Sequence, residues 1–287
     1  MLNILNVVAD GIAYGMLLFL FSIGLSITLG LMRFINLAHG AFGMCGGYAT
    51  TTLMSGLGVP FLLTLPAAFL IAGLIGFALE RAVIRFVYRE SALQQVLFSI
   101  GLAFAASAIA VIIFGPQQQP VKLPVWLTMR LDIFGLQINA YRVFLLGVGA
   151  GAAAAMIALF NYTLFGARIR AAVDNRRAAE GIGIRVDRLF ALTFALGAAM
   201  AGLGGALAVD FLGLDPTFPF KYLVIVLMIV AIGGPGSIGG SLVAAVTLGI
   251  IDALFKYLVP EVGPFVIYAF LVAILTAYPK GLARRTA

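Results

Sequence analysis

The sequence is poor in the residues from which most enzyme sites and covalent cross-links are built. Among its 287 residues there are one cysteine, one histidine and one tryptophan, and charged residues make up 10%. Cys45 has no second cysteine for an intrachain disulfide, and one histidine with one cysteine cannot supply the ligands of a structural zinc site. The Gly-x-x-x-x-Gly-Lys-Ser/Thr motif that cradles the phosphates of ATP is also missing. We therefore expect no catalytic residue, no metal and no cofactor bound by this chain.

Apolar residues are in excess, at 63% of the chain, against roughly 45–50% in a typical soluble domain. A soluble protein of this size cannot hide so much apolar surface, because its exterior still needs polar cover. The composition excludes soluble enzymes, disulfide-stabilised secreted domains and disordered tails. It predicts an all-α integral membrane protein with one transmembrane domain over 1–287. The first apolar run lacks a basic segment before it and a small-residue cleavage site after it, so we expect a retained first span.

Long apolar stretches predict where the chain crosses the membrane, since a spanning helix needs about 20 mostly apolar residues. The stretches without charged residues are 11–32, 34–79, 91–121, 143–167, 189–209, 222–251 and 262–279. The second divides at a Gly-Leu-Gly-Val-Pro turn signal, 56–60, and the sixth at the glycine-rich run 233–240. The break at 233–240 leaves a short first helix and a second helix that reaches Leu258. The pattern predicts a polytopic helical bundle of about eight spans plus one short, broken half-helix.

The distribution of basic residues predicts how the chain is oriented. Thirteen arginines and lysines lie on the side that holds Arg33, the loops 80–90 and 166–188, and the C-terminus, and five lie on the other side. Basic residues accumulate on the cytoplasmic side of membrane proteins. We therefore expect a multi-pass protein of the bacterial inner membrane with its N-terminus outside and its C-terminus in the cytoplasm. The net charge of +7 then reflects orientation in a lipid membrane, and the interpretation as a nucleic-acid binder loses its support.

Three segments between the spans have a character of their own. Residues 115–141 and 210–221 are predicted to be external loops, the first with a small hairpin around Phe134-Gly135. Residues 166–188 are predicted to be a cytoplasmic loop that contains a short helix closed by Gly181 in a left-handed cap. Ala171, Ala178, Ala179 and Ile182 would lie close to one stripe of that helix, with arginines on its flanks. This periodicity fits a helix that docks on another protein and fits a plain basic surface loop equally well.

The same loop carries a resemblance to a known family. Together with the start of the next span it contains Gly166-Ala-Arg-Ile-Arg170-Ala171, Gly181-Ile-Gly-Ile184 and Asp187-Arg-Leu-Phe-Ala-Leu-Thr-Phe194. Further matches are Phe34-Ile-Asn-Leu-Ala-His-Gly40, Glu80-Arg-Ala-Val-Ile-Arg85, Gly233-Gly-Pro-Gly-Ser-Ile-Gly-Gly240 and Tyr278-Pro-Lys-Gly-Leu282. In these patches, which follow the family order over nearly the whole chain, the sequence resembles permease subunits of bacterial branched-chain amino acid ABC importers. It departs from them at Leu37, where phenylalanine is common, and at Ala41, where many members carry an acidic residue.

The resemblance implies a set of partners and two groups of site residues. The partners would be a second, similar permease, two cytoplasmic ATPase subunits that use ATP and Mg²⁺, and an extracytoplasmic substrate-binding protein. The residues that would couple to the ATPase are Gly166, Arg168, Arg170, Ala171, Asn175, Ala178, Ala179, Gly181 and Ile182. The candidates for the pathway or its gate are Asn36, His39, Gly40, Gly233, Gly234, Ser237, Gly239 and Gly240. The chain itself would not be an enzyme.

The pathway candidates also have structural interpretations. Asn36 and His39 lie three residues apart, so they would share a helical face near the cytoplasmic surface and either cap that helix or line the pathway mouth. The run 233–240 is either a tight turn between two helices or a broken helix whose backbone groups face the pathway. Asp252 and Lys256 are expected to pair with each other at i,i+4 spacing. Gln94, Gln95 and Ser99 are expected to form hydrogen bonds between helices.

The substrate that the resemblance implies is leucine, isoleucine or valine. Close relatives carry urea, short amides or aromatic acids, and the sequence reveals no pocket that would choose among them. Two readings from other classes remain: a self-contained secondary transporter and a membrane scaffold that transports nothing. The first would need an intramembrane carboxylate for ion coupling and internal repeats, and the chain offers only Asp252 near a membrane edge, without clear self-similarity.

Overall fold

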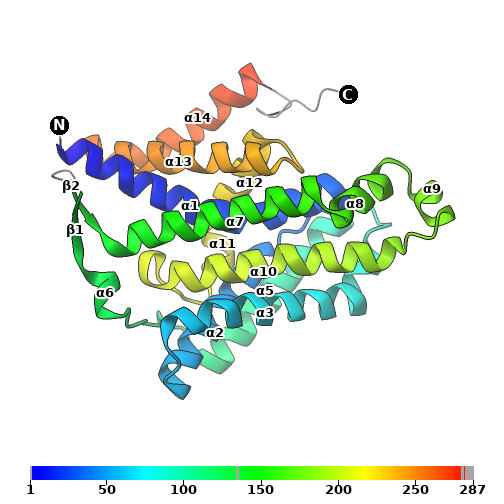
Figure 1. Cartoon of the computed structure of the whole chain (residues 1–287), viewed down its shortest axis with the longest axis horizontal. Coiled ribbons are helices and arrows are strands. Elements are labelled where there is room, and N and C mark those ends of the chain that lie inside the picture. Colours follow the sequence, from blue (N-terminus) through cyan, green and yellow to red (C-terminus); the bar gives the residue numbers. More distant parts are fainter. Residues whose placement is uncertain (1, 134–135, 279–280, 282–287) are drawn as a thin grey trace.

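Helices dominate the computed structural model, which describes residues 2–133, 136–278 and 281 of the chain (Figure 1). Six of the described helices are long and apolar enough to cross a membrane: Ile4–Met32, Phe61–Val87, Ala92–Phe114, Ala140–Tyr162, Val186–Leu212 and Ile238–Leu258. Two shorter apolar helices cover Phe218–Gly233 and Phe265–Ala277. The predicted all-α polytopic architecture is confirmed, and the number of about eight spans stays a prediction.

The elements follow one another along the chain with few long connections. The helices are α1 (Leu2–Met32), α2 (His39–Leu57), α3 (Phe61–Leu79), the π-helical η1 (Glu80–Ile84), α4 (Arg85–Val87), α5 (Ala92–Phe114), α6 (Val125–Thr128), α7 (Ala140–Tyr162), α8 (Leu164–Asp174), α9 (Arg176–Gly181), α10 (Val186–Leu212), α11 (Phe218–Lys221), α12 (Leu223–Gly233), α13 (Ile238–Leu258) and α14 (Gly263–Ala277). The strands β1 (Arg130–Ile133) and β2 (Leu136–Asn139) form an antiparallel pair.

Both breaks predicted inside long apolar stretches occur where glycine and proline stand. Gly58 ends α2 in the left-handed conformation with φ of 63°, and Pro60 precedes α3. The glycine-rich run separates the short α12 from α13, which ends at Leu258 as predicted. The first span starts earlier than the charge-free stretch suggested, because Asp10 lies inside α1 and pairs with Arg142 of α7. An ion pair between neighbouring helices makes a charge tolerable within an apolar helix.

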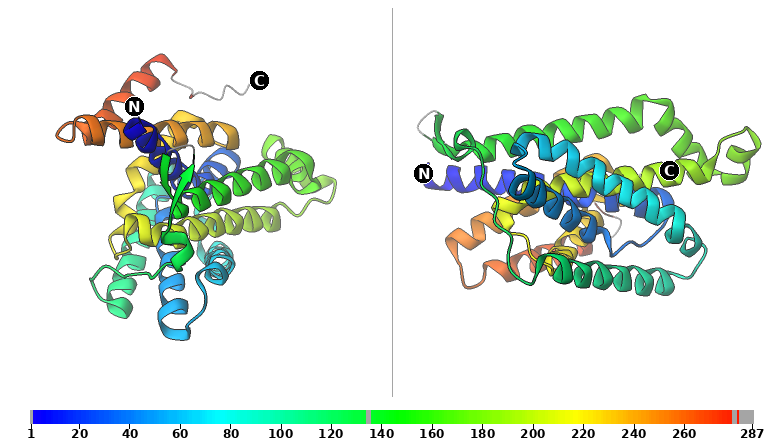
Figure 2. Two further views of the ribbon diagram at one scale, coloured as in Figure 1. Left: turned by 60° about the vertical axis from the view of Figure 1, so that its left-hand side comes forward. Right: turned by 90° about the horizontal axis from the view of Figure 1, so that it is seen from below.

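Two helices form the centre of the bundle. In the most apolar windows of α1 and α10, 83% and 78% of the residues are buried, against 17% in α5. Helices α3, α7 and α13 pack around this pair, and Figure 2 shows α13 and α14 on one side of it and α2 and α5 on the other. Because α5 is as apolar as α1 but mostly uncovered, its exposed face is suited to lipid or to another membrane helix.

Glycines allow the central helices to approach each other closely. A side chain at Gly24 of α1 would collide with the backbone of Gly197 in α10, and one at Gly46 of α2 would collide with that of Gly202. Gly205 of α10 meets the backbone of Gly43 in the same way. Small residues drive helix association in membranes, since they bring backbones into van der Waals contact. The run of glycines and alanines in α10 is therefore its contact surface.

The two ends of the bundle carry different structures (Figure 1). At one end, which we call the hairpin end, β1, β2 and α6 lie near the N-terminus, and the pair Arg130–Asn139 opens the hairpin. The predicted hairpin is confirmed in its strands, while its turn at Phe134-Gly135 lies outside the described residues. The opposite end, which we call the α8–α9 end, carries the two short helices of the predicted cytoplasmic loop.

Candidate functional site

The loop predicted to hold one short helix holds two, because the chain breaks at Asn175. This residue is extended, with φ of −149°, and its Oδ1 accepts a hydrogen bond of 3.0 Å from the N–H of Ala178. It thereby satisfies one of the backbone donors that a new helix leaves unpaired, as an N-cap does. The prediction of a left-handed cap at Gly181 is wrong: α9 ends there, and the residue with positive φ, 86°, is Gly183.

The predicted alanine stripe does not form, because the break at Asn175 changes the phase of the helix. Ala179 is buried, Ala171 is partly buried, and Ala178 is exposed. Ile182 follows α9 and is 76% exposed. The small residues of this loop therefore point in different directions, and one large apolar side chain stands out from the surface.

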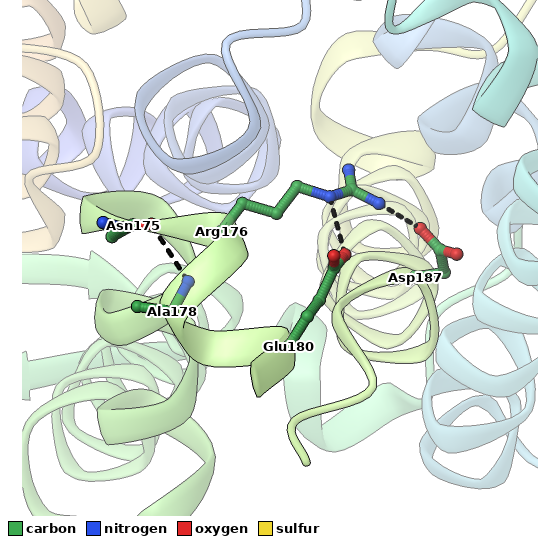
Figure 3. Close-up of polar contacts among 5 residues, drawn as sticks. All are labelled: Asn175, Arg176, Ala178, Glu180 and Asp187. Atoms are coloured by element: carbon green, nitrogen blue, oxygen red, sulfur yellow. Dashed lines mark hydrogen bonds and ion pairs between the residues drawn. The ribbon is translucent and has the colours of Figure 1, made fainter. Parts of the chain in front are cut away.

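An arginine at the start of α9 ties that helix to α10. Figure 3 shows Arg176 reaching Glu180 of the same helix and Asp187 in the first turn of α10, with nitrogen–oxygen distances of 2.9 and 2.6 Å. Burial lowers the pKa of Arg176, but the two carboxylates outweigh it and raise the pKa above its ordinary value. The sequence did not predict that these three residues contact one another. The Arg–Glu spacing of four was visible there, but the contact with Asp187 depends on the turn between the helices.

Two of the residues predicted to couple to an ATPase hold α8 against α7. A side chain at Gly166 would collide with the backbone of Phe160, whose carbonyl oxygen also accepts a hydrogen bond from Arg170 Nη1. Thr163 caps α8 by accepting a 3.4 Å bond from the N–H of Gly166. The bend between α7 and α8 is thus fixed from within the chain. Arg168, like Arg170, is exposed.

A groove lies between α8 and the start of α10 at the α8–α9 end. Its volume is about 620 Å³. Its charged lining consists of Arg168, Arg185 and Arg188, and Ile182 and Leu192 add exposed apolar surface. Arginine combined with protruding apolar side chains is the composition of a protein–protein contact surface.

The first group of pathway candidates lies deeper than the sequence indicated. His39 begins α2 beside Gly24, where the side chain of His39 occupies the space that a methyl group on Gly24 would need. Gly24 is eight residues before the end of α1, so the segment 33–38 returns along α1 toward its middle. Asn36 precedes α2 and its Oδ1 accepts a bond of 3.1 Å from Ala38 N–H, so the prediction that both side chains share a helical face is wrong.

Polar groups of α5 hold this returning segment. The N–H of Ile35 donates to Gln95 Oε1 over 3.1 Å, and Ser99 Oγ donates to the carbonyl of Ile35 over 3.4 Å. Non-helical backbone at membrane depth needs such partners, because no water is there to replace them. Gln95 and Ser99 therefore bond to a non-helical segment and not to another helix, so the expectation of hydrogen bonds between helices is wrong in its partner. Gln94 instead completes a capping box with Ser91 at the start of α5.

The start of α2 meets α11 in a small cavity. A side chain at Gly40 would lie 2.8 Å from the Cα of Pro219, and the space of about 10 Å³ around His39 is bounded by Phe218 and Tyr222. That volume is near the minimum for one water molecule. His39 Nε2 is buried and has no hydrogen-bond partner among the described residues. A polar atom left unpaired in an apolar, aromatic surrounding is costly, which makes this point sensitive to any movement of α2.

The second group of pathway candidates forms a tight turn between α12 and α13. A side chain at Gly240 would collide with the carbonyl oxygen of Gly233, and Gly234 has a φ of 84°. Ser237 caps α13 by accepting a 3.0 Å bond from the N–H of Gly240, whereas Gly239 has open space around its Cα. The geometry agrees with the tight-turn interpretation of the sequence.

Hydrogen bonds to α1 fix this turn in place. The N–H of Gly236 donates to the carbonyl oxygen of Ser26 over 2.8 Å, and Ser241 Oγ donates to Ser26 Oγ over 2.9 Å. Gly30, one turn further along α1, packs directly on Gly236. The turn is therefore attached to the central helix of the bundle.

A cavity joins the two sets of predicted site residues. It has a volume of about 400 Å³ and lies between α1, α7, α8 and the α12–α13 turn. Arg170 lines it from α8, and Gly236, Ser237 and Gly239 line it from the turn. The chain segment predicted to receive mechanical work thus faces the segment predicted to gate the pathway.

Other ionisable residues were candidates for an ion pair within a span or for a metal site. Lys256 pairs with Asp252 over 2.7 Å, as expected, with 55% of the lysine side chain and 6% of the aspartate side chain exposed. No group of three or more His, Cys, Asp or Glu side chains that could hold a metal occurs in the part of the chain that the structure describes. A multi-pass helical bundle whose centre combines broken helices, glycine contacts and buried polar groups is typical of membrane transport proteins.

Comparison with known proteins identifies the family. Residues 7–275 match the family described as branched-chain amino acid transport system permease components, and the chain belongs to it. It is 29% identical to the LivH permease protein of the high-affinity branched-chain amino acid transport system of Escherichia coli, covering 96% of this chain and 94% of the relative. The Salmonella typhimurium LivH protein is 28% identical with the same coverage, and the Pseudomonas aeruginosa permease BraD is 24% identical over 98% and 96%. No solved structure gives a significant match.

Proposed function

We propose that the chain is the permease subunit of an ABC importer that carries leucine, isoleucine and valine across the bacterial inner membrane. It forms half of the pathway and pairs with a second permease of the same family. An extracytoplasmic binding protein delivers the solute at the hairpin end. Two cytoplasmic ATPase subunits bind ATP and Mg²⁺ and engage the α8–α9 end, so this chain needs no cofactor and catalyses no reaction itself.

The substrate class rests on the relatives. Proteins from Escherichia coli, Salmonella typhimurium and Pseudomonas aeruginosa that match nearly the whole chain are named as branched-chain amino acid permeases. The orientation rests on charge. Two cavities at the α8–α9 end are lined by arginines: Arg81, Arg85 and Arg176 line one, and Arg168 and Arg188 line the other. An excess of arginine favours the cytoplasmic side.

The observation that carries the coupling role is the cavity between α8 and the α12–α13 turn. When the ATPase subunits bind ATP, they favour one arrangement of the α8–α9 end over another. Because Arg170 and Gly166 fix α8 to the end of α7, the two helices move together. When α7 and α8 move, the packing around Gly236 and Ser237 changes, because these residues line the same cavity. The turn then passes the movement to α1 through Ser26.

The test of docking replaces Ile182 by aspartate in the complete transporter. Ile182 is 76% exposed, so it contributes little to packing within the fold. The variant Ile182→Asp should therefore leave the subunit inserted, while the ATPase subunits no longer co-purify with it. Loss of a central apolar contact costs at least about 2 kcal/mol in a protein interface, which corresponds to a loss of roughly 30-fold in binding. Val125→Asp introduces the same charge at a residue 74% exposed at the hairpin end, and it should retain the ATPase subunits.

The substrate is tested in vesicles that contain the complete complex with its binding protein. We expect ATP-dependent, saturable uptake of labelled leucine and none of labelled urea. Urea uptake without leucine uptake would contradict the substrate assignment but not the docking of ATPase subunits. Retention of those subunits by Ile182→Asp at unchanged affinity would contradict the docking assignment but not the substrate.

A further inference from the structure

A second basic cavity lies at the α8–α9 end, away from the groove beside α8. We call it the arginine cavity: it has a volume of about 420 Å³ and is lined by Arg81, Arg85, Arg89 and Arg176, together with Glu80 and Asp187 and aromatic side chains. Four arginines against two carboxylates leave an excess of two positive charges. Such an excess in a hollow at the end of a membrane helix attracts an anion.

Three of these arginines come from one short stretch of the chain. Arg81 lies in η1, Arg85 begins α4 and Arg89 stands in the turn after α4, and all three line the same cavity. None of them takes part in an ion pair within the described residues. The guanidinium groups of Arg81 and Arg85 instead lie over phenylalanine rings, at 5.9 and 4.6 Å from the ring centres. Their hydrogen-bond donors remain available for a ligand.

The two carboxylates do not cancel this charge. Asp187 is engaged by Arg176, which closes the cavity from α9. Glu80 is buried beside Tyr88, and the two side chains interact with each other below the surface of the cavity. The carboxylates are thus both engaged, and the guanidinium groups of Arg81, Arg85 and Arg89 are the groups that a ligand would meet.

The surroundings favour a lipid over a soluble anion. Phe86 lines the cavity and is 60% exposed, and Val83 of η1 is 41% exposed. Leu93 and Leu97 of the neighbouring α5 are 67% and 61% exposed. Apolar side chains directly beside arginines at the end of a spanning helix provide a surface for acyl chains next to a site for the headgroup.

We propose that the arginine cavity binds the phosphate of an anionic phospholipid headgroup such as that of phosphatidylglycerol. The phosphate oxygens accept hydrogen bonds from Arg81, Arg85 and Arg89. The acyl chains lie along Phe86 and the exposed leucines of α5. Because Arg176 also pairs with Asp187 of α10, a bound lipid stabilises the position of α9 against α10.

The test measures lipid binding to the full-length protein by native mass spectrometry in a neutral detergent. The variant Arg81→Gln with Arg85→Gln should bind phosphatidylglycerol roughly 25-fold more weakly, because each arginine near an anionic headgroup contributes about a factor of five. Arg89→Gln alone, which disturbs no ion pair or ring contact within the described residues, should lose about fivefold. The matched control, Arg168→Gln with Arg188→Gln, removes the same charge at the same end outside the cavity and should bind as the unchanged protein does.

Each outcome decides for or against the site. Preference for phosphatidylglycerol over phosphatidylcholine, lost in both cavity variants and kept in the control, would support it. Equal losses in cavity variants and control would mean a general charge effect and would overturn it. Displacement of the lipid by inorganic phosphate would overturn the lipid assignment in favour of a soluble anion. If the complete transporter bound no lipid because the ATPase subunits cover the cavity, the lipid assignment would be overturned in favour of a protein contact. A thermal unfolding scan confirms that the Arg89 variant is folded.

Discussion

Single glycines set the distances at the centre of the molecule. Gly46 of α2 and Gly202 of α10 touch through their backbones, so the two helices cross with nothing between them. Gly56, ten residues further along α2, has open space around its Cα. The sequence placed Gly56 in the turn signal 56–60, yet both glycines lie inside α2, and the space around each depends on which helix is nearby. Glycine in a helix has a conformational cost that only close packing compensates.

This difference predicts opposite effects of one substitution at two positions. Gly46→Ala should destabilise the protein by about 1–3 kcal/mol, because its methyl group would overpack the α2–α10 crossing. Gly56→Ala should be neutral or stabilising by up to about 1 kcal/mol, because alanine is the better helix former. The measurement is the midpoint of thermal unfolding of the purified protein in detergent. Equal midpoints for both variants would show that α2 does not approach α10 closely.

At the scale of elements, the sequence predicted breaks caused by glycine and proline and missed those that depend on distant partners. The break between α12 and α13 was predicted, because a run of glycines interrupts a helix, while its form as a tight turn or a broken helix was left open. The return of residues 33–38 toward the middle of α1 was not predicted, since it depends on Gln95 and Ser99 sixty residues away. The break at Asn175 was missed for another reason: asparagine lies within a run of helix formers and acts through its own cap.

The cap at Asn175 makes a prediction for α9. Asn175→Ala removes the acceptor for the N–H of Ala178 and should cost the helix about 1 kcal/mol. Because proteolysis of a transiently opened segment follows its population, trypsin should cleave after Arg176 and Arg177 about fivefold faster. Asn175→Ser keeps a capping oxygen and should be cleaved at nearly the original rate. If the alanine and serine variants were cleaved equally fast, the cap would not be what defines α9.

At the scale of the whole molecule, hydrophobicity predicted the spans but not their order around the core. The helices α1 and α5 are similarly apolar, yet α1 is central and α5 is peripheral. The distinction comes from glycine contacts and from polar side chains such as Ser26, which bonds to the α12–α13 turn. The proposed coupling and gating residues were likewise named as two separate groups, and only the folded chain brings them to the same cavity. Their roles remain predictions.

The folded chain separates the hairpin end from the α8–α9 end, so the orientation drawn from charge becomes testable at two exposed residues. Gln137 of β2 and Ala178 of α9 are both exposed. In a background in which Cys45 is replaced by alanine, each is changed to cysteine and the subunit is produced without partners. A membrane-impermeant maleimide added to the periplasmic side should label Gln137→Cys and should reach Ala178→Cys only after the membrane is permeabilised. The reason is energetic: arginines are retained on the cytoplasmic side during insertion, and the α8–α9 end carries most of them. The reverse labelling pattern would place α9 outside, where no ATP-driven subunit could reach it.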